Sequence, residues 1–428
     1  MTNRRVELVR IEKPVYGGSF LARVDGKAIF VPLTIPGEQV QLRITEDKRS
    51  YAKAEIEKVI ESASQRMLPL CPHFGFCGGC QYQHATYETQ LGWKQAILRE
   101  TLERAGIRVD CKIDVLAADP WHYRNRIRLI LDKSGKPGYR SRQSHAVVPV
   151  DQCVIAAPLL MRTATTLAEE LRRRGGPAQG VELTLFCNTT ETELLAEVAI
   201  PNTVRMPFAE LAKTVAEGIP ELIGIQLVLD MPGANKPRTL DRWGSDALTY
   251  HAGGSAYHVA HGAFFQVNRW LVDSLVQAVT LQSSGTSAWD LYAGVGLFAL
   301  PLTRSFKRVV AVESSATSLT SLRENLRGTC GEAVHADTLD FLRQNSKDRQ
   351  PDLIVLDPPR SGLGSEATSI LGDVAAPSVL YVSCDPATLA RDLKALVASG
   401  YCVKSVTMID LFPQTMHLET LIHLRRSC

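Results

Sequence analysis

Residues 289–300 read WDLYAGVGLFAL, and this stretch decides the fold. The run Ala288–Tyr292 predicts a β-strand, and Leu297–Leu302 predicts the start of a helix. Between them lie Gly294 and Gly296, which let the backbone approach a bound adenosine closely at the carboxyl end of a strand. A Gly-x-Gly pair by itself also fits a tight turn, so the neighbouring segments must decide what the loop does.

From about residue 251 onward, stretches with helical periodicity alternate with short apolar runs. This alternation predicts a parallel, doubly wound α/β sheet. The predicted helices are Val272–Leu281, Ala316–Leu326 and Ala387–Ser399. The predicted strands are Arg308–Val312, Asp352–Leu356 and Val379–Ser383.

The 428 residues are long enough for several domains. Short strands around the Asp25-Gly26 turn predict a small oligonucleotide-binding (OB)-like barrel at residues 1–62, a fold that suits single-stranded nucleic acid. An ordinary β domain fits these residues equally well. A cysteine-rich segment follows at 63–95, then a mixed α+β domain at 96–250 and the α/β domain at 251–428.

Composition excludes several classes of protein. The chain has 48 Lys and Arg against 45 Asp and Glu, a net charge of +3, which is too small to indicate a polyanionic partner by itself. No apolar run approaches the ~18 residues of a membrane span, and the opening MTNRRVELVRIEK lacks the apolar region of a secretory signal. We therefore expect a cytoplasmic protein without a membrane segment. Its ten cysteines indicate metal ligands or catalytic groups rather than disulfides.

Three of these cysteines form a C-x5-C-x2-C cluster with interleaved glycines: Cys71, Cys77 and Cys80. Thiolates that converge on one centre need a tightly folded backbone, which glycine permits. Three ligands leave such a site one short. Cys153 is the expected fourth, because it also lies in a proline-flanked loop before a helix. Zinc, an iron–sulfur cluster and buried free cysteines remain open from the residues alone.

Two carboxylates follow the glycine loop. Glu313 ends the next predicted strand, about twenty residues after the glycines, where an acidic side chain can accept hydrogen bonds from ribose hydroxyls. Asp337 either touches an adenine edge or caps the helix that follows it. These features fit both a dehydrogenase and an S-adenosylmethionine-dependent methyltransferase, so the segments further along must decide.

Three later segments carry reactive side chains. Asp357 ends an apolar strand before Pro-Pro, and Cys384 ends another directly before a helix, where the helix dipole favours the thiolate. Glu419 lies at the start of the terminal strand, a costly place for a carboxylate without a role. Gln266, beside two phenylalanines, can orient a base edge or the methyl donor.

A nucleophile, a carboxylate and a methyl donor together fit methylation of a pyrimidine at C5. Addition of a thiolate to C6 makes C5 nucleophilic towards a sulfonium methyl, and a base must then remove the C5 proton so that the thiol leaves. We predict Cys384 as the nucleophile and Glu419 as the base. Asp357 would bind the target base or the ammonium of the donor, and the base must leave its stack to reach such a site.

Residues 121–145 combine basic and aromatic side chains with a single acidic residue. Guanidinium groups bind phosphates and rings stack on unpaired bases, which single-stranded RNA loops require. A solvated β-hairpin is the simpler alternative. The arginines expected to contact RNA are Arg124, Arg126, Arg128, Arg140 and Arg142.

Taken in order, the motifs resemble those of the bacterial RNA uracil-5-methyltransferases, and they are most similar to the 23S rRNA type. The matching stretches are CPHFGFCGGC, VDQC, AFFQVN, DLYAGVG, VES, LDPPRSG, YVSCDPATLARD and HLET. The resemblance covers the whole chain. It implies an N-terminal TRAM barrel, a central RNA-binding domain, and a class I, Rossmann-like methyltransferase domain.

The resemblance also implies the functional residues. Cys384 would be the nucleophile and Glu419 the proton acceptor, and four cysteines would hold a [4Fe–4S] cluster. Leu297 stands where family members often carry Asn, so one polar contact to the cofactor is not expected. The implied cluster ligands are Cys71, Cys77, Cys80 and Cys153. The residues implied to line the S-adenosylmethionine or base pocket are Gln266, Tyr292, Glu313, Asp337 and Asp357, together with Gly294 and Gly296 of the glycine loop.

Several alternatives remain. The tRNA-directed bacterial relatives usually lack both barrel and cluster, which favours 23S rRNA as the substrate. Cytosine-5 RNA methyltransferases also use Cys thiolates but lack a carboxylate at the position that corresponds to Glu419. A non-catalytic iron–sulfur or RNA-binding protein would not need Cys384, Asp357 and Glu419 together. We expect the enzyme to be a monomer with an RNA substrate.

Overall fold

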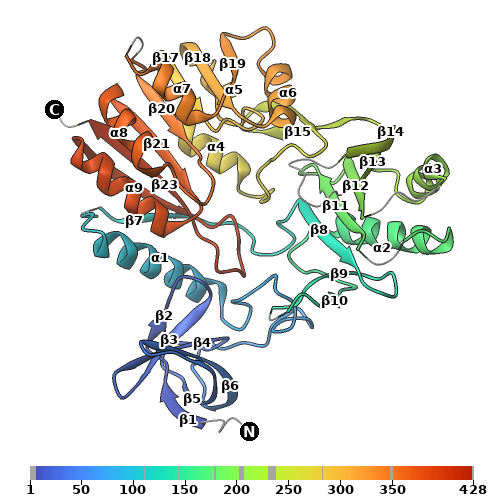
Figure 1. The fold of residues 1–428 in the computed structure, drawn as a ribbon, viewed down its shortest axis with the longest axis vertical. Coiled ribbons are helices and arrows are strands. Elements are labelled where there is room, and N and C mark those ends of the chain that lie inside the picture. The colour runs from blue at the N-terminus through green and yellow to red at the C-terminus, as the bar shows by residue number, and fades with distance from the viewer. Residues whose placement is uncertain are drawn as a thin grey trace.

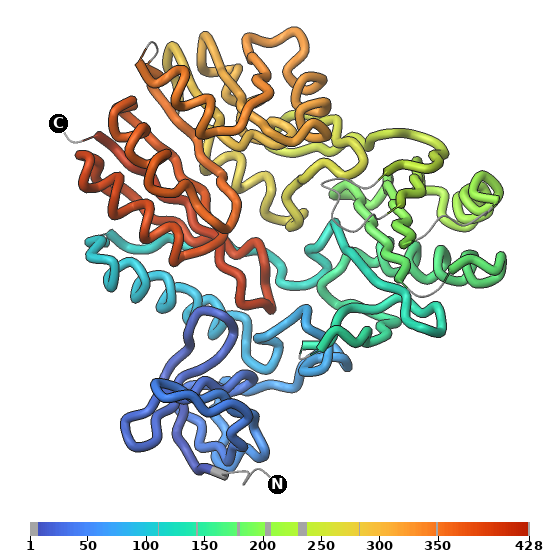
Figure 2. Tube along the Cα trace, in the orientation of Figure 1, coloured from blue at the N-terminus to red at the C-terminus, as the bar shows by residue number. Residues whose placement is uncertain are grey.

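The computed structural model describes residues 6–109, 111–142, 144–177, 180–201, 207–229, 238–281, 283–347 and 350–426. Residues 1–5 and 427–428, at the outer ends of the first and last predicted domains, lie outside this description. The fold has a blue N-terminal body, a green central body, and a larger body that runs from yellow to red (Figures 1 and 2).

The N-terminal body is a curled sheet with the strand order β1-β5-β6-β4-β3-β2. Its core includes Phe20, Val31 and Leu42, none of them exposed. Successive strand residues face opposite sides, so the alternating apolar residues close one side of the sheet. This confirms the predicted OB-like barrel. The strands are β1 Val6–Arg10, β2 Lys13–Pro14, β3 Ser19–Val24, β4 Lys27–Pro32, β5 Gln39–Asp47 and β6 Tyr51–Glu61.

The C-terminal body is built on an eight-stranded sheet in the order β19-β18-β17-β20-β21-β23-β22-β7. Ala288 and Val309 face one core, whereas their neighbours Trp289 and Val310 face another. Both faces of the sheet are therefore covered, as in a doubly wound fold. The strands are β7 Ile113–Leu116, β17 Gly285–Leu291, β18 Phe306–Glu313, β19 Gly331–His335, β20 Leu353–Leu356, β21 Ser378–Ser383, β22 Tyr401–Ile409 and β23 Glu419–Arg426.

Five adjacent strands of this sheet, from β19 to β21, run parallel as predicted. Strand β23 runs antiparallel to both β21 and β22. The chain between β22 and β23 is too short for a crossover, so it returns as a hairpin, which the helix–strand alternation did not indicate. The helices are α4 Val272–Thr280, α5 Ala299–Leu302, α6 Ala316–Asn325, α7 Thr338–Asn345, α8 Gly364–Val374 and α9 Pro386–Ala398.

Helix α1 (Tyr87–Arg104) and strand β7 join this C-terminal body although they precede the central one. Strand β7 pairs in parallel with β22, and α1 packs against α9 (Figure 1). Residues 87–116 therefore pack with the C-terminal body, and β7 forms the edge of its sheet.

The central body is a seven-stranded sheet in the order β10-β9-β8-β11-β12-β13-β14, and α2 and α3 pack on it. A separate hairpin, β15 with β16, leads into the C-terminal body. None of the described helices is long and apolar enough to cross a membrane. The elements are β8 Arg126–Leu131, β9 Pro137–Arg140, β10 Val147–Pro149, α2 Pro158–Arg173, β11 Glu182–Cys187, β12 Leu194–Ile200, α3 Phe208–Gly218, β13 Leu222–Leu229, β14 Arg238–Gly244, β15 Ala247–Ala252 and β16 Ser255–Ala260.

Candidate active site

Three predicted reactive residues meet at one edge of the C-terminal sheet. Asp357 directly follows β20, Cys384 directly follows β21, and Glu419 opens β23. The last residue pair of β21 and β23 is Ser383 opposite Thr420. One further step in this register sets Cys384 opposite Glu419. Residues opposite each other on antiparallel strands project to the same face, so the thiol and the carboxyl share one site.

The electrostatics of this site differ from the sequence expectation. Burial raises the pKa of the Cys384 thiol to about 11, and the nearby Glu419 and Asp357 carboxylates raise it further against the opposing charge of Arg360. Burial is the largest cause, so the free protein favours the neutral thiol although Cys384 lies directly before α9.

The two carboxyls also favour their protonated forms. Burial raises the pKa of Asp357 to about 7. Burial and then the charge of Asp357 raise the pKa of Glu419 well above its ordinary value, while Arg360 opposes this rise. Only 4% of Glu419 is exposed. A buried carboxyl with a raised pKa is suited to proton transfer near neutral pH.

No role was predicted for Arg360 from the sequence, but its guanidinium places a positive charge at this site. Its charge lowers the pKa of Cys384 and of Glu419. Its guanidinium Nη2 lies 3.2 Å from Nδ1 of His417, and burial followed by the charge of Arg360 lowers the pKa of that imidazole to about 4. The signal was present in the sequence, because Arg360 directly follows the Asp-Pro-Pro motif.

The glycine loop lies beside the reactive edge. A small cavity of about 30 Å³ is lined by Gln266, Asp357 and residues of the loop. The Gln266 amide Nε2 donates to Asp357 Oδ2 at 3.4 Å. The lining residues are Phe264, Phe265, Gln266, Tyr292, Ala293, Gly294, Val295, Leu297, Phe298 and Asp357. Leu297 thus lines the cavity with an apolar side chain.

The two loop glycines differ in what they permit. Both have a positive φ, +57° at Gly294 and +90° at Gly296. A Cβ at Gly296 would lie 2.8 Å from Leu322 Cδ1, whereas a Cβ at Gly294 would meet nothing within 4 Å. Gly296 therefore allows α6 to pack closely, and Gly294 leaves open space above the loop.

Glu313 and Asp337 flank the loop on the next strands. Glu313 Oε2 accepts from the Gly294 backbone N–H at 2.8 Å, and Oε1 accepts from the Ser315 N–H at 2.6 Å. These two hydrogen bonds hold Glu313 against the glycine loop. Asp337 caps α7, accepting from the Leu339 N–H at 2.8 Å. Of the two roles considered for Asp337, the structure contains the helix cap, and the adenine contact stays a prediction.

Asp290 is a buried carboxyl beneath the loop to which the sequence assigned no role. It is fully buried. Burial raises its pKa to about 8 against the nearby backbone amide of Ala299, and the charges of Asp357 and Glu313 add to the rise. Its place at the end of an apolar strand before two glycines could have identified it.

All four predicted cluster cysteines line one cavity of about 80 Å³. Burial raises the pKa of Cys80 to about 12, and the charges of Cys153 and Cys77 contribute. Gly75 adopts φ +88°, and a Cβ at Gly78 would lie 3.1 Å from the Arg140 carbonyl oxygen, so both turns need glycine. Among the described residues, no three His, Cys, Asp or Glu are arranged to hold a metal ion. Metal binding here stays a prediction.

The five arginines predicted to contact RNA occupy different environments. Arg124, Arg126 and Arg128 line a cleft of about 1090 Å³ between the central sheet and α6. Arg126 donates to the Ala263 carbonyl at 2.7 Å and lies 4.2 Å above the Phe186 ring. Arg140 lies 3.9 Å from Glu182, and Arg142 Nη2 lies 3.8 Å from Glu55 of the barrel. Arg124 also lines the cysteine cavity.

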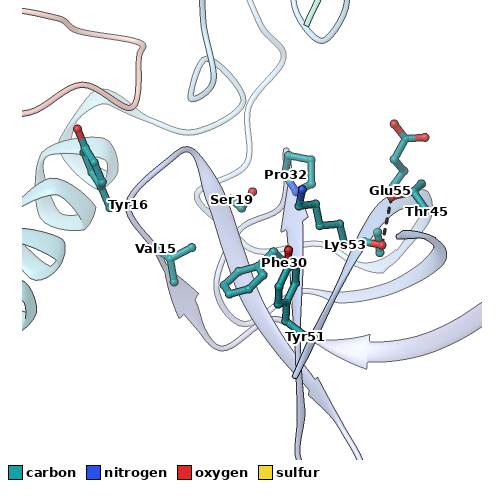
Figure 3. A pocket seen from close by; sticks show the side chains of 10 residues that line it. Val15, Tyr16, Ser19, Phe30, Pro32, Thr45, Tyr51, Lys53 and Glu55 are labelled. Atoms are coloured by element: carbon teal, nitrogen blue, oxygen red, sulfur yellow. Dashed lines mark hydrogen bonds between the residues drawn. The ribbon is translucent and has the colours of Figure 1, made fainter. Parts of the chain in front are cut away.

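A second open hollow of about 490 Å³ lies on the barrel. Figure 3 shows the rings of Phe30 and Tyr51 side by side with Lys53 beside them. The two ring centroids are 5.9 Å apart. Tyr16 lines the edge of the hollow, and its side chain points away from the other residues (Figure 3). Aromatic rings beside a cation are suited to unpaired bases.

Comparison with known families gives matches in three parts of the chain. Residues 1–56 match the TRAM domain. Residues 341–427, which contain Cys384 and Glu419, match the family described as tRNA (Uracil-5-)-methyltransferase. Residues 273–375 match a family described as conserved hypothetical protein 95.

Whole-chain relatives extend these matches. The chain is 33% identical over 445 residues to the 23S rRNA (uracil(1939)-C(5))-methyltransferase RlmD of Klebsiella pneumoniae subsp. pneumoniae, covering 100% of this chain and 97% of that protein. It is 31% identical over 439 residues to an uncharacterized RNA methyltransferase of Thermotoga maritima, covering 98% and 99%.

A solved structure shares the fold. The Pyrococcus abyssi tRNA (uracil-54, C5)-methyltransferase, in complex with S-adenosyl-L-homocysteine, superposes with a TM-score of 0.79 at 22% identity, covering 98% of this chain and 100% of that chain. With relatives more than 30% identical along its whole length, and with a thiol and a carboxyl paired at the edge of its sheet, the chain belongs to the RNA uracil-C5-methyltransferase family.

Proposed function

We propose that this protein transfers a methyl group from S-adenosylmethionine to C5 of a uridine in 23S rRNA. The register that sets Cys384 opposite Glu419 carries the proposal, because the chemistry needs both groups on one face of the same base. The substrate class is supported by the relatives named 23S rRNA (uracil(1939)-C(5))-methyltransferase, which match along the whole chain. Such a substrate implies action in the cytoplasm, and we propose that the enzyme acts as a monomer.

Cys384 is the proposed nucleophile. Its Sγ forms a bond to C6 of the uracil ring, and the electron pair displaced from the C5–C6 double bond makes C5 nucleophilic. Because the free thiol has a pKa of about 11, it must lose its proton to solvent water before or as Sγ adds to C6. Arg360 favours the thiolate, and a bound cationic methyl donor would act in the same direction.

Glu419 is the proposed base. After C5 has gained the methyl group, Glu419 accepts the C5 proton, the C5–C6 double bond forms again, and the Cys384–C6 bond breaks. Glu419 must be a carboxylate to accept this proton, a form that the charge of Arg360 favours, and its raised pKa then makes it a stronger base than an ordinary exposed carboxylate. Asp357 is held by Gln266 at the bottom of the site and is the proposed partner of the uracil edge or the donor ammonium.

S-adenosylmethionine supplies the sulfonium methyl group when it is bound. A Cβ at Gly294 would meet nothing within 4 Å, and two backbone amides fix Glu313, which is the proposed acceptor for the ribose hydroxyls. The proposed binding residues are Gln266, Tyr292, Gly294, Gly296, Glu313, Asp337 and Asp357. Asp337, which caps α7, is the proposed contact of the adenine edge.

The barrel and the central body are the proposed RNA-binding parts. The aromatic hollow of the barrel and the cleft lined by Arg124, Arg126 and Arg128 offer rings and cations for an unpaired RNA segment. We keep Arg140 and Arg142 as proposed contacts near the cysteine cavity. The domain division 1–62, 63–95, 96–250 and 251–428 is proposed as a functional one, with residues 87–116 serving the last domain structurally.

A [4Fe–4S] cluster is the proposed occupant of the cysteine cavity. Its support is the set of four thiols from two distant segments, Cys71, Cys77, Cys80 and Cys153, around one small cavity. In a four-iron cluster each thiolate binds a different iron, so the sulfurs need not converge on one point. Arg124 lines the same cavity and would offset the negative charge of the thiolates. The group would join residues 71–80 to the loop at Cys153, and no step of the methylation needs it.

The direct test is a methylation assay on purified protein. With methyl-labelled S-adenosylmethionine, 23S rRNA is expected to gain 5-methyluridine, and nucleoside mass mapping locates the uridine. Exclusive labelling of tRNA would change the substrate class, and 5-methylcytidine would identify a cytosine-5 enzyme. An absence of transfer with RNA bound would favour a non-catalytic protein.

The cluster has a separate test. Protein purified without oxygen is expected to be brown with iron–sulfur absorbance, and a colourless zinc protein would contradict the cluster.

A further inference from the structure

Tyr16 of the N-terminal barrel reaches the loop that carries the nucleophile. It lies between β2 and β3, followed by Gly17 and Gly18 with φ +102° and +83°. Its hydroxyl donates to Asp385 Oδ2 at 3.1 Å, and its ring packs at the edge of a core of the C-terminal body. Asp385 is the residue directly after Cys384. The barrel therefore contributes a side chain to the immediate surroundings of the active site.

Asp385 connects several chain segments around Cys384 through hydrogen bonds. Its other oxygen, Oδ1, accepts from the backbone amides of Ala387 and Thr388 at 2.9 and 3.0 Å and so caps α9. The Thr388 hydroxyl donates to the Arg360 carbonyl oxygen at 3.1 Å. Asp385 thus links the start of α9, the loop of Arg360 and, through Tyr16, the barrel.

The phenol of Tyr16 remains a hydrogen-bond donor in this environment. Burial, followed by the charge and hydrogen bond of Asp385, raises the pKa of Tyr16 well above its ordinary value. The Arg360 guanidinium and the Cys384 thiol also act on it electrostatically. Tyr16 therefore lies close to both the nucleophile and the cation of the site.

The barrel also contacts the opposite side of the site. Met416, in the segment between β22 and β23, packs against the barrel core, and its backbone amide donates at 3.1 Å to Oε1 of Gln81 in the cysteine-rich segment that follows the barrel. That segment leads directly to Glu419. The barrel is thus fixed against both chain segments that carry the proposed reactive groups.

We propose that Tyr16 is a positioning residue for Cys384, which acts by holding Asp385 and with it the end of β21 in the geometry for attack on the base. This inference rests on the proposed function, and it adds a catalytic contribution from a domain otherwise assigned to RNA binding. Removal of the hydroxyl leaves the Asp385 carboxylate less neutralised beside Cys384, which disfavours the thiolate.

The test uses the full-length Tyr16→Phe variant, which keeps the ring and removes one hydrogen bond. Its single-turnover methylation rate is expected to fall by about tenfold, within the range that small misplacements cost, with unchanged KM values for RNA and S-adenosylmethionine. In protein without RNA, alkylation of Cys384 by iodoacetamide at pH 9 is expected to slow by about twofold or more. Peptide mass spectrometry follows Cys384, with exposed Cys330 as the internal reference.

Two further variants separate positioning from stability. Tyr401→Phe removes a phenol hydrogen bond of 3.0 Å to the Ala376 carbonyl, far along the same sheet, and should leave both rates unchanged. Asp385→Asn keeps a side chain that caps helices as well as Asp does but loses the charge. The double variant Tyr16→Phe, Asp385→Asn is expected to be no slower than the slower single variant, because both act through one bond.

Three results would overturn the proposal. They are a Tyr16→Phe protein with wild-type methylation and alkylation rates, a raised KM for RNA at unchanged kcat, and effects of the two single variants that add fully. If the wild-type protein methylates no uridine, the proposed function fails, and the alkylation of Cys384 still decides whether Tyr16 acts on the thiol.

Discussion

Cys384 and Glu419 stand opposite each other where β21 and β23 end their antiparallel pairing, one step beyond Ser383 and Thr420. The thiol and the carboxyl therefore share one face. Burial and then the Glu419 carboxylate raise the pKa of the Cys384 thiol, so the carboxyl changes the reactivity of the thiol.

Cys384→Ala is expected to abolish methyl transfer, because no other described side chain stands at this register position to add to C6. RNA binding should stay within about twofold of wild type, since the substitution removes no charge. A filter-binding assay and a tritium-transfer assay measure the two properties. Normal turnover in this variant would refute the covalent mechanism, and Cys330→Ala at an exposed site is the matched control.

Glu419→Gln is expected to block release of the RNA, so that a covalent protein–RNA adduct survives on denaturing gels. The same variant should show faster alkylation of Cys384 at pH 9, because loss of the Glu419 charge lowers the thiol pKa. Faster alkylation of Cys384 together with a trapped covalent adduct would distinguish loss of the base from general damage to the site. Slower alkylation would contradict the electrostatic coupling.

Asp290→Asn is expected to make stability less dependent on pH. The native pKa of Asp290, about 8, exceeds its ordinary value near 4, so the folded protein holds a proton that the unfolded chain loses. This contribution is complete below pH 4 and is lost as pH rises towards 8, at up to about 1.4 kcal/mol per pH unit. Thermal midpoints from pH 4 to 9 should fall less in the variant, and an unchanged slope would contradict the assignment.

Gly296→Ala is expected to lower the free energy of unfolding by about 1–3 kcal/mol, because its Cβ would clash with Leu322 at a positive φ. Gly294→Ala is the control. Its φ is also positive but its Cβ has open space, so it should cost about 1 kcal/mol. Urea titration compares the two, and equal losses would show that packing against α6 is unimportant.

Lys94→Met is expected to destabilise the protein by about 3–5 kcal/mol, because it leaves the Asp410 carboxylate buried without its cation. Lys94 Nζ lies 2.5 Å from Asp410 Oδ1, with the two side chains 1% and 0% exposed. Asp410→Asn combined with Lys94→Met should recover part of the loss. A single variant as stable as wild type would contradict the importance of the pair.

Local motifs predicted much of this molecule. The alternation around WDLYAGVGLFAL identified the strands from β17 to β21 and the edge at which ligands bind. The Asp-Pro-Pro, Ser-Cys-Asp-Pro and His-Leu-Glu-Thr segments each place a reactive group next to the end or start of a strand. Each motif lies next to its own strand end, so local spacing and residue type were sufficient to identify it.

Features that depend on contacts between distant segments could not be predicted from local motifs. The raised pKa of Cys384 arises from burial and then from Glu419 and Asp357, which belong to other segments, and the hydroxyl beside Asp385 comes from the barrel. The reversed direction of β23 follows from the pairing of the last strands rather than from their residues. No periodicity within a segment reports which remote segment lies next to it.

The pairing of β7 with β22 has a consequence for biosynthesis. Ile113 is made early and its partner Val406 is made near the end, so the edge of the last sheet cannot close until almost the whole polypeptide has left the ribosome. A nascent chain must keep Ile113–Leu116 unpaired, with its apolar residues open to improper partners. Fragments that begin after residue 116 would lack this strand, and we expect them to aggregate during expression.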